Sequence, residues 1–143
     1  KQHPPLRLAG HLVENTTFHP RTFFGYQRVN GVPIAEPEKL LIDCLYKPER
    51  AGGMGELRRV LPELWRNVNE QKLREYLLRF GVGAIYGRLG FLQEEWKLKT
   101  TMRPFLLHHL PKGYVKLNPS RGRTKSYNPI WRVIRNDNER AAE

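Results

Sequence analysis

The chain has 143 residues, a length that suits one domain and buries enough surface to fold without disulfide bonds. Its net charge is +11, from 25 lysines and arginines against 14 acids, and this excess favours an anionic partner. The single cysteine, Cys44, excludes an intrachain disulfide and a thiolate zinc site. The sequence contains no run of about 18 apolar residues that would predict a membrane span, and we expect a cytoplasmic protein.

Short strands are predicted near the N-terminus. Residues 1–10 resemble an interdomain linker, and residues 6–35 contain several β-prone runs. The sharpest local pattern is Asn30-Gly31 between Val29 and Val32, which predicts a two-residue type I′ hairpin turn because both central residues need positive φ.

Helices are predicted in the middle of the chain. The first begins at Pro37, carries an apolar stripe, and ends before Pro48. That stripe comprises Leu40, Leu41, Cys44 and Leu45. A second helical pattern follows Gly52-Gly53, and Pro62 predicts a bend or a break within it.

Capping residues define the next predicted helix. Asn69 suits its N-cap and Gly81 suits the left-handed position after its last turn. Its stripe comprises Leu73, Tyr76, Leu77 and Phe80. Residues 84–96 predict another helix, with Ile85, Leu89 and Leu92 buried, and residues 102–110 predict a short one.

The last third of the chain predicts two strands, at residues 113–117 and 130–135, around a basic turn region at 119–126. In the second strand, alternation places Trp131, Val133 and Arg135 on one face. Residues 137–143 are expected to form a flexible tail. The predicted fold class is therefore α+β, with N-terminal short strands and a hairpin, a central helical bundle and C-terminal basic strands.

Most of the positive charge lies in that last third, because residues 97–136 contain ten basic residues and no acid. Interleaved aromatic residues suit nucleic acid, since cations neutralise phosphates and rings stack on bases. A solvated basic surface with core aromatics, or docking on an acidic protein, would produce the same pattern. The candidate nucleic-acid-binding residues are Lys112, Lys116, Arg121, Arg123, Lys125, Arg132 and Arg135.

Signals for catalysis are weak. Asp43 lies within an apolar helix and is expected to pair with a cation, with Arg88 as the candidate, while most other acids fall on solvated helix faces. Cys44 is expected to be an inert core thiol, and His108-His109 diverge on a helix without a flanking carboxylate. We predict no catalytic residue, no metal site and no cofactor. The alternative is a metal-dependent nuclease with carboxylates such as Glu38 and Asp43.

Five segments in order resemble the C-terminal domain of AbiEi antitoxins. They span residues 30–136 and are Ile34–Asp43, Lys47–Gly53, Arg88–Leu92, Gly113–Pro119 and Tyr127–Ile134. The resemblance assigns residues 11–136 to this domain. It also marks six family-pattern positions, namely Asp43, Arg88, Gly90, Lys116, Trp131 and Arg132. Of these, Asp43, Gly90 and Trp131 look structural, and Lys116 and Arg132 are surface candidates.

The resemblance implies a role in a type IV toxin–antitoxin system and in phage defence. Such proteins typically join an N-terminal winged helix-turn-helix, which represses the operon, to a C-terminal domain linked to antitoxicity and cooperative DNA binding. The implied partners are operator DNA, with RNA as an alternative, and a nucleotidyltransferase-like toxin that is counteracted without a stable complex. No membrane partner is implied. We find no room for a complete winged helix-turn-helix before residue 30.

Overall fold

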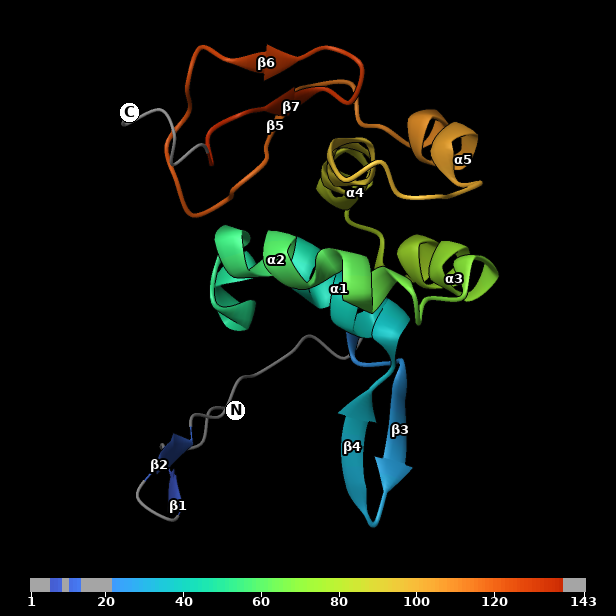
Figure 1. Cartoon of the computed structure of the whole chain (residues 1–143), viewed down its shortest axis with the longest axis vertical. Coiled ribbons are helices and arrows are strands. Elements are labelled where there is room, and N and C mark those ends of the chain that lie inside the picture. The colour runs from blue at the N-terminus through green and yellow to red at the C-terminus, as the bar shows by residue number, and fades with distance from the viewer. Residues whose placement is uncertain (1–5, 9–10, 14–21, 138–143) are drawn as a thin grey trace.

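The computed structural model describes residues 6–8, 11–13 and 22–137. It confirms an α+β fold with short strands at both ends and helices between them (Figure 1). The elements are β1 Leu6–Leu8, β2 His11–Val13, β3 Tyr26–Val29, β4 Val32–Ala35, α1 Pro37–Tyr46, the 3₁₀ helix η2 Pro48–Ala51, α2 Met54–Trp65, α3 Glu70–Phe80, α4 Ala84–Glu95, α5 Arg103–His108, β5 Val115–Lys116, β6 Tyr127–Asn128 and β7 Val133–Ile134.

The predicted hairpin is confirmed. Strands β3 and β4 pair antiparallel with Val29 opposite Val32, and the two turn residues have the left-handed φ values of 51° at Asn30 and 80° at Gly31. Figure 1 shows this hairpin projecting from the helical body. Strands β1 and β2 form a second antiparallel pair.

Helix boundaries follow their capping residues. Pro37 begins α1, and Asn69 caps α3 by accepting a hydrogen bond from the Lys72 N–H at 3.0 Å. Gly81 ends α3 with a φ of 73°, as predicted. In α2, however, the predicted break is absent, since the helix runs through Pro62 to Trp65.

Two helices lie at the centre of the molecule. Helix α1 contacts α2, α3 and α4, while α4 also contacts α5, β5 and β7. Helix α4 is therefore buried along most of its length, including the predicted Ile85, Leu89 and Leu92. One predicted core residue is misplaced, because Leu40 is 43% exposed and Ile42 is buried instead.

The C-terminal sheet differs most from prediction. Its strands have two residues each in the order β5-β7-β6, with β5 parallel and β6 antiparallel to β7. The predicted alternation fails because Arg132 adopts a φ of 54°, which interrupts the strand before Val133. Val133 and Ile134 are both buried, whereas Arg135 is exposed, so Trp131, Val133 and Arg135 do not share one face.

Candidate nucleic-acid interface

The seven candidate cations differ in exposure. Five are exposed, and Lys116 and Arg132 are half-buried. The exposed five are Lys112, Arg121, Arg123, Lys125 and Arg135. Among the described residues, no carboxylate forms an ion pair with any of the seven. Their charge is therefore not neutralised within that part of the chain.

Three of the exposed cations lie on one ordered loop, residues 118–126, here called the basic loop. The buried side chain of Asn136 holds the start of this loop. Its amide nitrogen shares its two hydrogens among the carbonyls of Asn118, Arg121 and Gly122, which lie at 2.8–3.1 Å, and its amide oxygen accepts from the Asn118 N–H at 2.8 Å. Arg121, Arg123 and Lys125 thus project from a backbone that is fixed from within.

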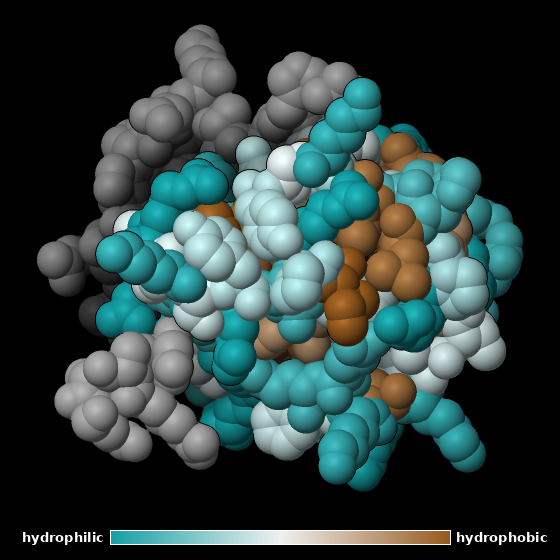
Figure 2. Space-filling model, turned by 90° about the horizontal axis from the view of Figure 1, so that it is seen from above, coloured by the Kyte–Doolittle hydropathy of each residue, from teal (hydrophilic) through white to brown (hydrophobic). Residues whose placement is uncertain are grey.

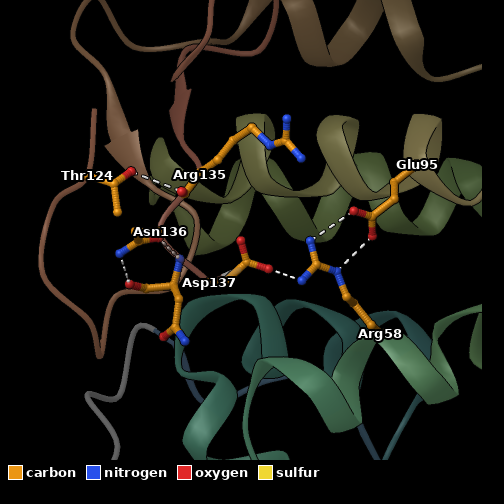
Figure 3. A network of polar contacts seen from close by, with 7 residues as sticks. Arg58, Glu95, Thr124, Arg135, Asn136 and Asp137 are labelled. Carbon is orange, nitrogen blue, oxygen red and sulfur yellow. Dashed lines mark hydrogen bonds and ion pairs between the residues drawn. The ribbon is translucent and has the colours of Figure 1, made fainter. Parts of the chain in front are cut away.

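The end of the basic loop is tied to β7 and its neighbours. The Thr124 hydroxyl donates to the Arg135 carbonyl at 2.9 Å, and the Arg135 N–H donates to the Ser126 carbonyl at 2.8 Å. Figure 3 shows Thr124, Arg135 and Asn136 on the same side of the network. Both ends of the loop therefore depend on residues 135 and 136.

Asp137 fixes this region to the helical body. It is buried, and its carboxylate binds Arg58 of α2, which also forms a bidentate pair with Glu95 of α4 at 2.7 and 2.9 Å (Figure 3). The sequence placed Asp137 at the start of a flexible tail, and the structure instead makes it an anchor. Residues 138–143 lie outside the described part.

Two of the four remaining candidate cations have side-chain contacts of their own. The Arg132 guanidinium donates to the Pro111 carbonyl at 2.8 Å, and the Arg135 guanidinium lies 5.6 Å from the centre of the Phe91 ring. These contacts orient the two side chains and leave their charge unpaired within the described residues.

Aromatic residues accompany the cations at the sheet. Tyr114 and Tyr127 meet edge to face at 5.5 Å between ring centres and remain exposed, as does Ile130. Figure 2 looks onto the end of the molecule that carries the C-terminal sheet, where a hydrophobic band crosses a largely hydrophilic face. Trp131 is 1% exposed and belongs to the core, which agrees with the alternative in which aromatic residues of the basic segment are core residues.

Asp43 is bound by Lys39 and not by Arg88. The Lys39 ammonium lies 2.9 Å from the Asp43 carboxylate and within 5.5 Å of the ring centres of Phe24, Tyr26 and Phe80. The i, i+4 spacing on α1 could have indicated this pair. The Lys39 side chain has no exposed surface, and its aromatic surroundings come from segments distant in the sequence.

Arg88 has a different part in the fold. It is buried and donates to the Leu45 carbonyl at 3.0 Å and the Lys116 carbonyl at 2.9 Å, so it joins α1 to β5. Burial lowers the pKa of its guanidinium.

The side chains considered for catalysis, Cys44 and Glu38, lie in buried positions with structural contacts. Burial and then the nearby Asp43 charge raise the pKa of the Cys44 thiol to about 11, which agrees with an inert core thiol. Glu38 is buried and accepts the Asn69 N–H at 2.7 Å, so it does not lie on a solvated face. Across the described ranges, no three His, Cys, Asp or Glu side chains come together as metal ligands.

Within the part of the chain that the structure describes, none of the helices has the length and apolar character that a membrane span requires.

No curated protein and no solved structure matches this chain. The model of the AbiEi antitoxin C-terminal domain matches residues 7–95, more than half of the chain. This range contains Ile34–Asp43, Lys47–Gly53 and Arg88–Leu92, and ends before the two C-terminal segments that support the resemblance. On this match, the chain belongs to the AbiEi antitoxin C-terminal domain family, a regulatory kind of domain from toxin–antitoxin systems.

Proposed function

We propose that this domain contributes to an antitoxin and transcriptional regulator of a type IV system by presenting the basic loop to nucleic acid, with operator DNA as the first ligand. The toxin that it counteracts would be nucleotidyltransferase-like and would not need to form a stable complex. Family membership supports the antitoxin role. The basic face and its partner are our inference.

One observation carries the proposal: Arg121, Arg123 and Lys125 project from a hydrogen-bonded loop with no carboxylate partner among the described residues. Placing three cations on a fixed backbone lowers the entropy lost when each meets a phosphate. Exposed Tyr114 and Tyr127 add ring surface near β5 and β6. Together these features suit a phosphate backbone better than a small substrate.

The test replaces all three loop cations with glutamine and measures affinity for operator DNA over a range of salt concentrations. Each phosphate contact contributes about 0.9 to the slope of log affinity against log salt, so losing all three should reduce the slope by about 2.7. Toxin rescue should fall in parallel in co-expressing cells.

A matched control removes the same charge elsewhere. Arg28, Arg59 and Arg66 are exposed cations outside the basic segment, and replacing them with glutamine lowers the net charge equally. We expect this control to retain most of the slope and the rescue. Equal effects of the two triple variants would contradict a localised interface. If the unsubstituted chain binds RNA and not operator DNA, RNA is the ligand.

A further inference from the structure

Helix α4 packs against one face of the C-terminal sheet. It contacts both β5 and β7, and Val133 of β7 belongs to the core. A Cβ on Gly87 of α4 would lie 3.3 Å from Val133 Cγ1, so this side chain points toward the helix. Figure 1 shows the sheet at the end of the molecule opposite the β3–β4 hairpin, with α4 on one side of it. The opposite side of the sheet is here called the outer face.

Strand register places two tyrosines and a lysine on the outer face. Because side chains alternate along a strand, Ile134 points away from α4 when Val133 points toward it. Tyr127 and Lys116 are the cross-strand partners of Ile134, and partners in register share a face. The ring of Tyr114 joins them, since its centre lies 5.5 Å from that of the Tyr127 ring. The outer face therefore comprises Tyr114, Lys116, Tyr127 and Ile134.

The two tyrosines are the solvent-accessible aromatic groups of this face. Tyr114 is 39% exposed and Tyr127 is 53% exposed, whereas Ile134 has no exposed surface. A single exposed ring is ordinary on a protein surface, but two rings in edge-to-face contact on one sheet face present neighbouring flat surfaces to a ligand. Bases of any identity stack on such rings, because every base has a π face.

An exposed cation lies two residues before each tyrosine. Lys112 precedes Tyr114 and Lys125 precedes Tyr127, and two residues span at most about 7 Å of chain. Neither lysine forms an ion pair within the described residues, and the segment 97–136 contains no acid. Cations beside exposed rings match a ligand that alternates phosphates with flat bases better than they match a neutral sugar or an apolar peptide.

We propose that the outer face of the C-terminal sheet binds single-stranded nucleic acid, DNA or RNA, through its bases. One base stacks on Tyr127 and the next on Tyr114, while the phosphates meet Lys112, Lys116 and Lys125. The bases of a duplex already pair and stack with one another, so this face requires an unpaired segment. The surface goes beyond the function proposed for the basic loop, which needs phosphates alone and accepts a duplex.

Fluorescence anisotropy of the full chain with labelled oligo-dT, oligo-U and a mixed-sequence DNA duplex of the same length tests the proposal. Tyr127→Leu keeps an apolar side chain beside Ile134 but removes the ring, and it should weaken binding of the single strands about tenfold. Tyr127→Phe keeps the ring and should bind within about twofold of the parent chain. Both variants should bind the duplex as the parent chain does. The more tightly bound of the two oligonucleotides identifies DNA or RNA as the preferred strand.

Further variants separate stacking from phosphate contacts. Lys112→Gln, outside the basic loop, should reduce the salt slope of single-strand affinity by about 0.7, whereas Tyr127→Leu should leave that slope unchanged because it removes no charge. Trp96→Leu is the matched control, since Trp96 is an exposed aromatic residue beyond the end of α4, and it should leave binding unchanged.

The proposal is wrong if neither oligonucleotide binds, if Tyr127→Leu binds them as tightly as the parent chain does, or if it weakens duplex binding equally. Single-strand binding that depends on the Tyr127 ring supports the outer face even where the duplex does not bind. In that case the function proposed for the basic loop fails alone.

Discussion

At the scale of single residues, two glycines of α4 decide how closely the C-terminal segment approaches. A Cβ on Gly90 would overlap the Trp131 ring at 2.2 Å, and one on Gly87 would lie 2.5 Å from the Trp131 carbonyl oxygen. Since Trp131 is fully enclosed in the core, neither contact has room to relax. The fold therefore depends on the absence of a side chain at these positions.

Gly90→Ala should consequently destabilise the protein by about 3 kcal/mol, at the upper end of the usual cost of overpacking a core. Denaturant unfolding followed by circular dichroism measures the loss. Gly113→Ala is the control, because a Cβ there meets nothing within 4 Å, and it should be nearly neutral. A neutral Gly90→Ala would show that the ring can move away.

At the scale of elements, polar contacts join the start of α1 to α3. Glu36 precedes α1 and accepts hydrogen bonds from the Tyr76 hydroxyl and from the Lys72 ammonium at 3.1 Å. The hydrogen bond with Tyr76 is the main reason that the pKa of Glu36 falls below its ordinary value of 4.5, and it raises the pKa of Tyr76 to about 12. The charged form of Glu36 and the neutral form of Tyr76 are thus both favoured by folding.

The pH dependence of the free energy of unfolding follows from the directions of these two pKa shifts. Because the folded-state pKa of Glu36 is lowered, the contribution of Glu36 to stability is complete above pH 4.5 and is lost as the pH falls through the folded pKa. Because the pKa of Tyr76 is raised, the contribution of Tyr76 to stability persists below pH 10 and is lost between pH 10 and about 12.

Tyr76→Phe should accordingly lower the free energy of unfolding by about 1.5 kcal/mol at pH 7. The difference from the parent chain should shrink below pH 4, and thermal unfolding at several pH values measures it. Tyr127→Phe, which removes an exposed hydroxyl, should show no comparable pH dependence. A difference that stays constant down to pH 2 would exclude the carboxylate as the partner.

The basic loop offers a second prediction at this scale, because its shape depends on the neutral residue Asn136. Asn136→Ala removes the hydrogen bonds to Asn118, Arg121 and Gly122 without changing the net charge. On the proposed function, affinity for operator DNA should fall about fivefold to tenfold, as expected when preorganisation is lost. Binding assays at fixed salt measure this change, and undiminished affinity would mean that charge alone matters. The exposed Asn67→Ala serves as the control.

At the scale of the whole molecule, α4 is the element around which the other parts assemble. Helix α1 packs on one side and the C-terminal sheet on the other, as Figure 1 shows. Arg88 extends from α4 to carbonyls in both neighbours, at Leu45 and Lys116. A charged side chain in this position is satisfied by backbone acceptors instead of a carboxylate.

Arg88→Met should therefore cost about 3 kcal/mol, since it leaves two carbonyl groups without their donors in the interior. Chemical denaturation of the full chain measures the change. Arg59→Met is a matched control, because Arg59 is exposed and pairs only with Glu56 on the surface of α2, and it should change stability by less than about 1 kcal/mol. Similar costs for the two variants would refute a central role for Arg88.

Local signals predicted much of the fold. The Asn30-Gly31 turn, the Asn69 cap and the Gly81 terminus each depend on the conformation of a few adjacent residues, and all three are confirmed. The strands at the C-terminus were predicted too long, because the positive φ of Arg132 and the pairing partners of β7 depend on distant contacts.

The sequence by itself determined most of the helix limits, the hairpin turn and the concentration of positive charge, since these depend on near neighbours or on composition alone. Only the tertiary structure decided that Lys39 binds Asp43 inside an aromatic enclosure, and that Asn136 and Asp137 hold the basic loop to the helices. Such contacts join residues far apart in the chain, and which of many possible partners meet is settled by the packing of the whole core.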